Sequence, residues 1–198
     1  MKSDLTIIFK KELYEFRYNY RVWVLTAIVI CFSYFPNVRK SNMQDFTILA
    51  FIILAIGQYI YNSYLTDISY KGILFLENIR IKSIYLFLTK LLFSSIIAGI
   101  IVLANVSNIK GVFSFLDISW IYPIVVFSSA IMQISATYVN GAENTAASIA
   151  ITISFAILIC IFFIKILFIK IIFSWSSAVF WSLLCELNSR SLKYRMQL

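Results

Sequence analysis

Histidine is absent from this chain of 198 residues, and acidic residues are scarce, with nine Asp and Glu against 17 Lys and Arg. Histidine is the commonest general base, proton relay and metal ligand in proteins. Its absence argues against intramembrane metalloproteases, which need two or three histidine ligands, and against membrane peptidases built on a His–Cys pair. The shortage of acids disfavours paired-carboxylate catalysis. It also disfavours transport driven by protons or sodium, which needs acids deep in the membrane.

Glycine is also rare, with five in the chain, and no G-x-x-x-x-G-K-[ST] occurs. A phosphate-binding loop needs such glycines because its backbone must approach the phosphates closely. The chain is therefore not expected to bind ATP itself, to carry a cofactor or metal, or to be an enzyme.

Hydrophobic residues are what the chain has in excess, at 61%, while charged residues make up 13%. This composition is far too apolar for a soluble domain and predicts a single transmembrane domain over residues 1–198. The net charge of +8 is attributed to Lys and Arg retained in the cytoplasm, and no nucleic-acid partner is expected. Cys31, Cys160 and Cys185 form no C-x-x-C and are predicted to be buried small hydrophobes.

Six segments of the chain approach the length of about 20 apolar residues that crosses a bilayer as a helix. They are residues 19–36, 46–65, 84–106, 118–139, 146–165 and 171–187. The predicted fold class is therefore an all-α integral membrane protein with six transmembrane helices.

The distribution of Lys and Arg orients these segments. With the N-terminus in the cytoplasm, eleven of the 17 lie in inside segments and five in outside segments, while Lys90 lies within the third span. Cytoplasmic segments carry the excess of Lys and Arg, so both termini and residues 66–83 are predicted to be cytoplasmic. The Ile-, Lys-, Phe- and Asn-rich composition fits an AT-rich bacterial genome and hence a bacterial cell membrane.

Residues 1–20 follow a three-four rhythm that is apolar except at Glu12. The stripe comprises Leu5, Ile8, Phe9, Glu12, Leu13, Phe16 and Tyr20. This pattern predicts an amphipathic helix in the membrane interface, with lysines toward anionic headgroups. A solvated leader with the same rhythm is the alternative.

Lys165 and Lys170 interrupt the long apolar region 146–187. A lysine at the bilayer centre costs roughly 2.5–3.5 kcal/mol, so this pair is predicted to lie at the outer face. The apolar residues beside the lysines would then form a re-entrant hairpin before the sixth span, packed against protein. A plain tight turn with snorkelling lysines is the alternative.

The segment between the second and third spans, YLTDISYKGILFLENIRIKSIYLFLTK at 64–90, places charges in an otherwise apolar sequence. Asp67 and Lys71 are an acid-to-base pair four residues apart, which favours a short helix. A cytoplasmic helix with charged and large apolar groups suits docking into a groove of a soluble partner. A helix that merely connects two spans is the alternative.

The same segment resembles the membrane (permease) subunits of type-2 ATP-binding-cassette (ABC) exporters. The residues that carry the resemblance are Asp67, Lys71-Gly72, Leu76-Glu77 in the phrase LFLENIRIKS, Ser83 and Lys90. In that family an aspartate after the second span precedes a short cytoplasmic coupling helix. The family's frequent proline is replaced here by Lys82-Ser83. The N-terminal KKELYEFRYNYR, the inside turn of residues 140–146 and the outer hairpin resemble further features of the family.

The resemblance implies that two membrane subunits pair, either two copies of this chain or this chain and a related permease. Each binds a separate ATPase subunit, which carries ATP and Mg²⁺, through a coupling helix at about residues 66–82. Closure of the ATPase dimer moves this helix and opens a path outward. The residues expected to hold the ATPase contact are Asp67, Lys71, Glu77, Arg80 and Lys82.

Polar residues within the spans are candidates for the translocation path or for helix packing, namely Gln58, Asn62, Ser129, Gln133 and Thr137. Such residues join membrane helices more often than they line a path. No charged pocket is evident, so an amphipathic substrate is expected, a secreted peptide above all. Two other interpretations stay open. One is the substrate-binding membrane subunit of a vitamin-uptake system, and the other is an immunity or scaffold protein that moves nothing.

Overall fold

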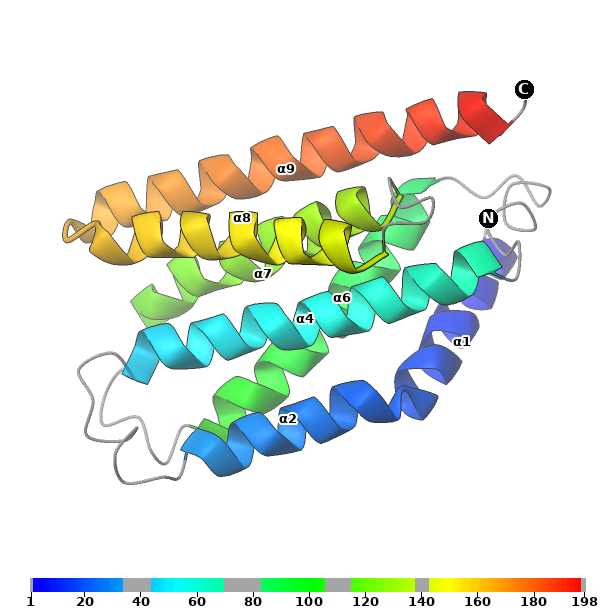
Figure 1. Ribbon diagram of the computed structural model, residues 1–198. Helices are drawn as coiled ribbons and strands as arrows, with labels where there is room; N and C mark the ends of the chain where they lie inside the picture. The colour runs from blue at the N-terminus through cyan, green and yellow to red at the C-terminus, as the bar shows by residue number, and fades with distance from the viewer. Residues whose placement is uncertain (1, 34–43, 70–82, 106–114, 138–142, 197–198) are drawn as a thin grey trace.

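The computed structural model describes residues 2–33, 44–69, 83–105, 115–137 and 143–196 (Figure 1). Regular structure within these ranges consists of seven helices, and no strand occurs there. They are α1 (Lys2–Tyr18), α2 (Tyr20–Ser33), α4 (Gln44–Ser69), α6 (Ser83–Asn105), α7 (Phe115–Thr137), α8 (Glu143–Phe163) and α9 (Leu167–Met196). The predicted all-α class is confirmed for these ranges, and each of the six apolar segments overlaps one of the helices after α1 over most of its length.

Four of these helices are long and apolar enough to cross a membrane. The qualifying stretches are Phe46–Ser63 in α4, Tyr85–Ala104 in α6, Ser119–Ala136 in α7 and Leu167–Asn188 in α9. The apolar stretches of α2 and α8 are shorter, at Tyr20–Cys31 and Ala147–Phe163. Four such helices in one bundle fit an integral membrane protein, because about 20 residues of helix match the thickness of the hydrocarbon core.

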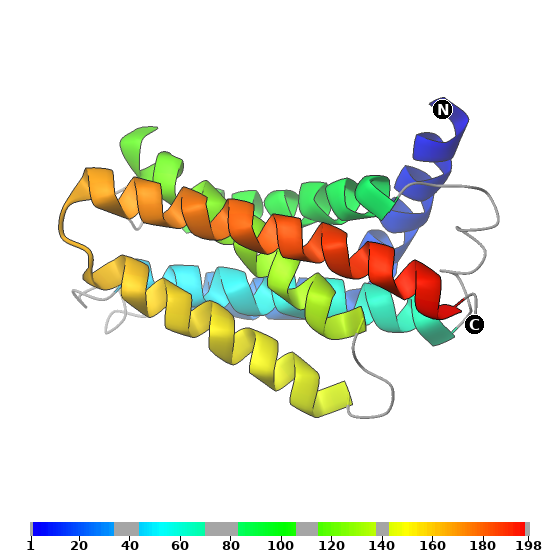
Figure 2. The same ribbon diagram turned by 90° about the horizontal axis from the view of Figure 1, so that it is seen from above.

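Helix α7 lies at the centre of the bundle and packs against α4, α6, α8 and α9 (Figures 1 and 2). Its side chains Ile124, Phe127 and Ala130 are fully buried. Helix α9 packs mainly along α7 and exposes Phe173 and Phe180 on its outer side. Lipid tails solvate such side chains as well as a protein interior does, so an outer membrane helix can stay apolar all round.

The connection from α8 to α9 is a tight turn and not the re-entrant hairpin that the sequence predicted (Figure 2). Helix α8 continues to Phe163 and α9 begins at Leu167, with the N–H of Lys170 already donating to the carbonyl of Ile166 at 3.0 Å. The apolar residues on each side of Lys165 extend an existing helix, which satisfies their backbone groups without a separate element. Lys165 is exposed in the turn.

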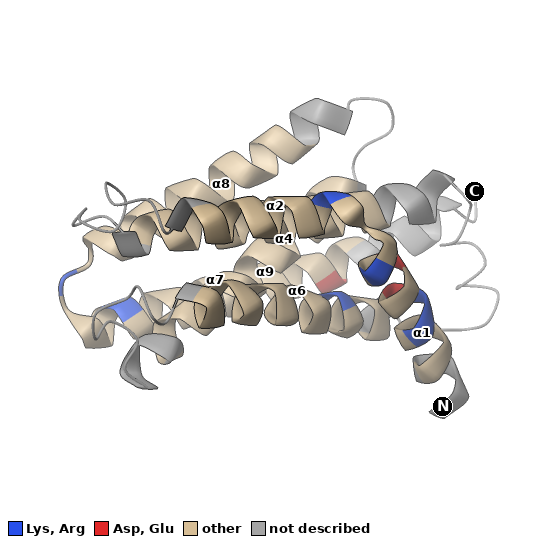
Figure 3. Ribbon diagram, turned by 90° about the horizontal axis from the view of Figure 1, so that it is seen from below, with Lys and Arg blue, Asp and Glu red and all other residues tan. Residues whose placement is uncertain are grey.

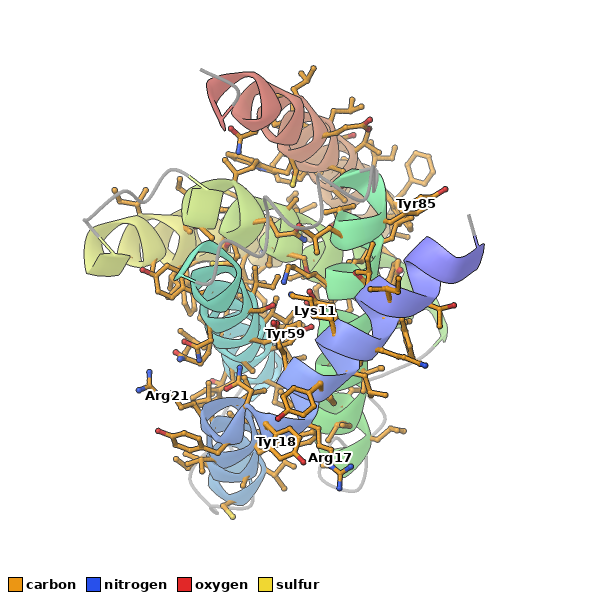
Figure 4. The ribbon with its side chains drawn as sticks, turned by 90° about the vertical axis from the view of Figure 1, so that its right-hand side faces the viewer. Lys11, Arg17, Tyr18, Arg21, Tyr59 and Tyr85 are labelled. Atoms are coloured by element: carbon orange, nitrogen blue, oxygen red, sulfur yellow. The ribbon has the colours of Figure 1, made fainter. Side chains whose placement is uncertain are left out.

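Helix α1 lies across one end of the bundle and contacts α4 and α6, as the end view shows (Figure 4). The N-terminal helix is therefore confirmed, but the predicted stripe does not share one environment. Ile8, Glu12 and Phe16 are buried against the other helices, whereas Leu13 and Tyr20 are exposed. The inner part of the stripe serves packing within the protein, which a sequence cannot distinguish from packing against lipid, because both need apolar side chains at the same spacing.

Asn19 separates α1 from α2 and fixes the change of direction. The Val22 N–H points to the Asn19 carbonyl at 3.1 Å and to its side-chain Oδ1 at 3.4 Å, an N-cap for α2. The Trp23 indole N–H donates to the carbonyl of Phe16 at 3.0 Å, and the Phe16 and Trp23 rings meet edge to face at 4.9 Å. One aromatic residue thus satisfies a carbonyl in the last turn of α1 and packs against the same turn.

The cysteines are all free, and the prediction that they are buried holds for one of them. Cys185 is buried, whereas Cys31 and Cys160 are exposed on α2 and α8. A small apolar side chain suits the lipid-facing side of a membrane helix as well as its interior, so hydrophobicity alone did not determine their positions.

Candidate functional site

A buried ion pair joins α1 to α6. The Lys90 ammonium lies 2.9 Å from Glu12 Oε1, and neither side chain is exposed to solvent. The two residues are 78 positions apart in the chain. Figure 3 shows the charged residues of α1 gathered at one end of the bundle. A pair of opposite charges enclosed by helices is the most unusual feature of the described residues, because each charge alone would be costly there.

Helix α4 supplies hydroxyl groups to the same site. The Tyr59 hydroxyl donates to Glu12 Oε2 at 2.8 Å, and the Lys90 ammonium donates to the Ser63 hydroxyl. The Ser63 hydroxyl in turn donates to Glu15 Oε2 at 2.6 Å and lies 3.3 Å from Glu12 Oε2. Three helices therefore meet through one hydrogen-bonded network, which we call the Glu12–Lys90 network. Its members are Lys11, Glu12, Glu15, Tyr59, Ser63 and Lys90.

Lys11 balances the charges of the network at its outer edge. Its ammonium lies 3.0 Å from Glu15 Oε1 and 3.4 Å from Glu12 Oε1. Lys11 and Glu15 are partly exposed, so the network runs from solvent to the enclosed Lys90. Figure 4 shows Lys11 of α1 near Tyr59 of α4. Two carboxylates and two ammonium groups alternate, so the formal charges cancel within the network.

The network keeps Glu12 ionised. Burial by itself raises the pKa of the Glu12 carboxyl. The positive charges of Lys90 and Lys11 lower the pKa. Hydrogen bonds from Lys90 and Tyr59 act in the same direction, and the pKa of Glu12 ends below its ordinary value of 4.5. The carboxylate is charged at neutral pH because these groups replace the water that burial removes.

Aromatic rings enclose the ion pair. Phe93, one turn after Lys90, packs its ring 5.1 Å from the ring of Phe16 and 5.6 Å from that of Phe9. The Tyr59 ring meets Phe16 edge to face at 5.8 Å. These rings come from the same three helices as the charges, so apolar and polar contacts hold one junction. A low-dielectric surrounding strengthens the attraction between the charges and increases the cost of losing either one.

The predicted ATPase-contact residues lie at the edge of what the structure describes. Asp67 lies in the last turn of α4, although its side chain is outside the described part. Lys71, Glu77, Arg80 and Lys82 all fall within residues 70–82, outside the described residues. Their role stays a prediction.

The predicted polar residues of the spans divide between two neighbouring helices. Gln58 and Asn62 are half-buried on α4, while Ser129 and Gln133 are buried on α7. Thr137 is the last residue of α7, and its side chain is not described. Path lining and helix packing both stay open for this set.

Helices α4 and α7 approach closely beside these residues. A Cβ atom at Gly57 would lie 3.0 Å from Met132 Cε and 3.3 Å from Met132 Sδ. The absence of a side chain at Gly57 gives Met132 the room to lie against α4, as small residues commonly do between membrane helices. Helices α4 and α7 are thus closely packed beside Gln58 and Gln133, and the role of the polar residues stays a prediction.

The sequence contained a signal for the Glu12–Lys90 network that the prediction did not use. Glu12 is the one charged member of an apolar stripe, and Lys90 lies inside an otherwise apolar span. Each residue alone is an irregularity, but their opposite charges suggest that they neutralise each other. Among the described residues, no three Cys, Asp or Glu side chains come together as a metal site.

No family model, no curated protein and no solved structure matches this chain.

Proposed function

We propose that this protein is the membrane subunit of a type-2 ABC exporter, with six spans and both termini in the cytoplasm. The observation that carries the proposal is the placement of helix ends. The end of α4 at Ser69 and the start of α6 at Ser83 lie at the same end of the bundle as α1 and the C-terminal end of α9 (Figure 1). The two helices that flank residues 70–82 in the sequence thus end and begin at the end of the bundle that we expect to face a cytoplasmic ATPase.

The distribution of basic residues supports this orientation. Lys10, Lys11, Arg17 and Arg21 lie on α1 and the first turn of α2, at the proposed cytoplasmic end (Figure 3). Lys165 occupies the turn at the opposite end. More basic residues at the first end agree with the tendency of Lys and Arg to remain in the cytoplasm. Tyr14, Tyr18 and Tyr20, all exposed, add the aromatic residues typical of a membrane interface.

Six spans require α2 and α8 to cross the membrane beside the four longer helices. Helix α8 has 21 residues and packs against α4 and α7, and α2 has 14 residues and packs against α4 and α6. At about 1.5 Å per residue, α8 matches the hydrocarbon core, while α2 falls short of it. A short span can be accommodated by local thinning of the bilayer.

The mechanism follows that of an ATP-driven conformational switch. A separate ATPase binds the segment at about 66–82, and Asp67, Lys71, Glu77, Arg80 and Lys82 make the contact. Closure of the ATPase on ATP favours one arrangement of the helices over the other and moves an amphipathic substrate, such as a peptide, outward. Differential binding of the ATPase to the two arrangements provides the driving force.

Pairing of two membrane subunits completes the proposal, as two copies of this chain or with a related permease. Helix α8 exposes Ser148, Thr152, Ala156 and Cys160 at intervals of four residues. Small residues at this spacing let two membrane helices approach closely. Oxidative crosslinking in native membranes tests this surface. Pairing of two copies through α8 yields a Cys160 disulfide dimer that Cys160→Ser abolishes and Cys31→Ser leaves intact, whereas a chain that crosslinks through Cys31 contradicts pairing through α8.

Native mass spectrometry of the complex purified from its own membranes into nanodiscs tests the function. A partner of the ATP-binding-cassette type, in a complex of two membrane and two ATPase subunits, is the expected result. Glu77→Lys combined with Arg80→Glu should abolish stimulation of the ATPase by the membrane subunits while the protein still inserts. Lys165→Glu, at the opposite end, is the control and should change nothing. A monomer without any nucleotide-binding partner would overturn the proposal in favour of an immunity or scaffold protein.

A further inference from the structure

We propose that Glu12 and Lys90 are positioning residues, which lock α1, α4 and α6 into one rigid body that carries the ATPase-contact segment. This inference rests on the proposed function for the role of residues 70–82. The rigid joint itself is argued from the described residues alone. The ion pair is not required for folding as such, because apolar side chains of similar volume can replace a buried ion pair without loss of stability.

The position of the network in the three helices is the first argument. Ser63 lies six residues before the end of α4, and Lys90 lies seven residues after the start of α6. At a rise of about 1.5 Å per residue, both are about 10 Å from the helix ends that continue into residues 70–82. A helix bends little over two turns, so fixing these positions fixes the ends of both helices relative to each other.

The nature of the contacts is the second argument. Apolar contacts such as that between the Phe16 and Phe93 rings tolerate a change of register at a lower cost than charged contacts do, because dispersion is not directional. The ion pair at 2.9 Å and the hydroxyl groups of Tyr59 and Ser63 require one register, since any shift leaves a charge without its partner. Buried ion pairs are known to specify one arrangement in some proteins. The network thus makes the junction of α1, α4 and α6 a single unit.

The consequence concerns how a force on residues 70–82 travels. An ATPase that displaces the ends of α4 and α6 also displaces α1, which has no other covalent route to them than α2 and residues 34–43. The joint therefore converts movement of the contact segment into movement of the whole end of the bundle. Without the Glu12–Lys90 network, the ends of α4 and α6 would move independently of each other, and only part of their displacement would reach α1.

Distances between spin labels test the joint in the full-length protein. The chain is prepared with Cys31, Cys160 and Cys185 replaced by Ser and with labels at Leu13→Cys on α1 and Leu92→Cys on α6, both exposed positions. A second pair, Leu103→Cys on α6 and Phe168→Cys on α9, is the control away from the network.

The apolar replacement Glu12→Met with Lys90→Leu decides between positioning and simple stability. We expect this variant to fold as stably as the parent but to broaden the α1–α6 distance distribution by about twofold, since apolar contacts allow several registers. The exchanged pair Glu12→Lys with Lys90→Glu should restore a narrower distribution, and the control distance should not change. An α1–α6 distribution as narrow in the apolar variant as in the parent would overturn the proposal.

The complex with the ATPase separates this inference from the proposed function. In the apolar variant, the ATPase should still bind, but stimulation of its turnover by the membrane subunit should fall by about tenfold. Normal stimulation in that variant overturns the coupling role of the joint while the exporter assignment stands. Absence of any ATPase in the complex overturns the exporter assignment, and the label distances then report on the rigid joint independently.

Discussion

Lys90 and Lys170 both lie in helices long enough to cross a membrane, yet the structure accommodates their charges differently. Lys90 is fully buried and pairs with Glu12 at 2.9 Å. Lys170 is half-buried, with its ammonium 4.5 Å above the ring centre of Trp120 and 6.0 Å from that of Phe162. One lysine has a carboxylate partner from a distant helix, and the other lies over aromatic rings at the rim of the bundle.

Distance from the helix end explains the difference. Lys170 is the fourth residue of α9, so its long side chain remains near the turn at residues 164–166. Lys90 lies two turns inside α6, where α1 and α4 cover it on either side. A charge near the end of a span can reach the polar interface, whereas a charge enclosed by protein needs an opposite charge. Depth and covering, rather than residue type, determine which partner a membrane lysine requires.

Removing the carboxylate should have the largest effect. Glu12→Ala leaves the Lys90 ammonium buried without its counter-charge, which should lower the free energy of unfolding by about 3–5 kcal/mol. Equilibrium unfolding of the purified protein in mixed micelles measures the loss. Glu12→Met with Lys90→Leu is the matched control and should be near neutral. If Glu12→Ala is as stable as this double variant, the ion pair carries no special stability.

Acid should reduce the stability contributed by the Glu12–Lys90 ion pair and leave the contact between Lys170 and Trp120 unchanged. Because the pKa of Glu12 is lowered in the folded protein, the stability contributed by its charge is fully present above pH 4.5. It is lost as the pH falls below that value, through the lower pKa of the folded state. Unfolding measured from pH 7 downward should show this loss in the parent and a flatter profile in Glu12→Gln. Identical profiles would show that Glu12 is not the group that titrates.

Lys170→Met should lower the free energy of unfolding less than Glu12→Ala does, because it leaves no buried charge without its partner. The variant keeps most of the apolar stem and loses the attraction to the Trp120 ring, worth about 0.5–2 kcal/mol. The same unfolding measurement detects it, and Lys170→Arg, which keeps a cation over the ring, should remain close to the parent. A loss as large as that of Glu12→Ala would contradict the distinction between rim and interior.

Lys165→Met should have the smallest effect. Lys165 is exposed in the turn between α8 and α9, and surface substitutions usually change stability by less than about 0.5 kcal/mol. Thermal unfolding of this variant beside Lys170→Met provides the comparison. A large destabilisation would mean that the turn depends on this lysine.

Much of the helix pattern could be predicted from the sequence. Apolar length alone placed α6, at Ser83–Asn105, close to the predicted 84–106, whereas α9, at Leu167–Met196, is longer at both ends than the predicted 171–187. The rhythm of residues 1–20 likewise predicted α1. The hairpin before α9 was mispredicted because two lysines indicate a rim but do not distinguish a tight turn from a re-entrant segment.

The candidate site was less predictable. Glu12 and Lys90 were visible as charges in apolar surroundings, but their contact joins residues 78 positions apart. Tyr59 and Ser63 carried no signal, since a tyrosine and a serine are ordinary in a membrane helix. Pairings across helices depend on rotation of each helix about its axis, and a helix that is apolar all round leaves that rotation undetermined.

By itself the sequence determined that this chain forms long apolar helices that fit a membrane protein, because the cost of unpaired backbone groups in lipid favours helices for such segments. It also determined which positions carry charge. The tertiary structure decided which faces of those helices are enclosed by other helices and which stay exposed, and it brought two charges that are far apart in the sequence into one ion pair. The physical reason is that hydrophobicity identifies a membrane helix without choosing its neighbours, whereas close packing and neutralisation of buried charge choose them.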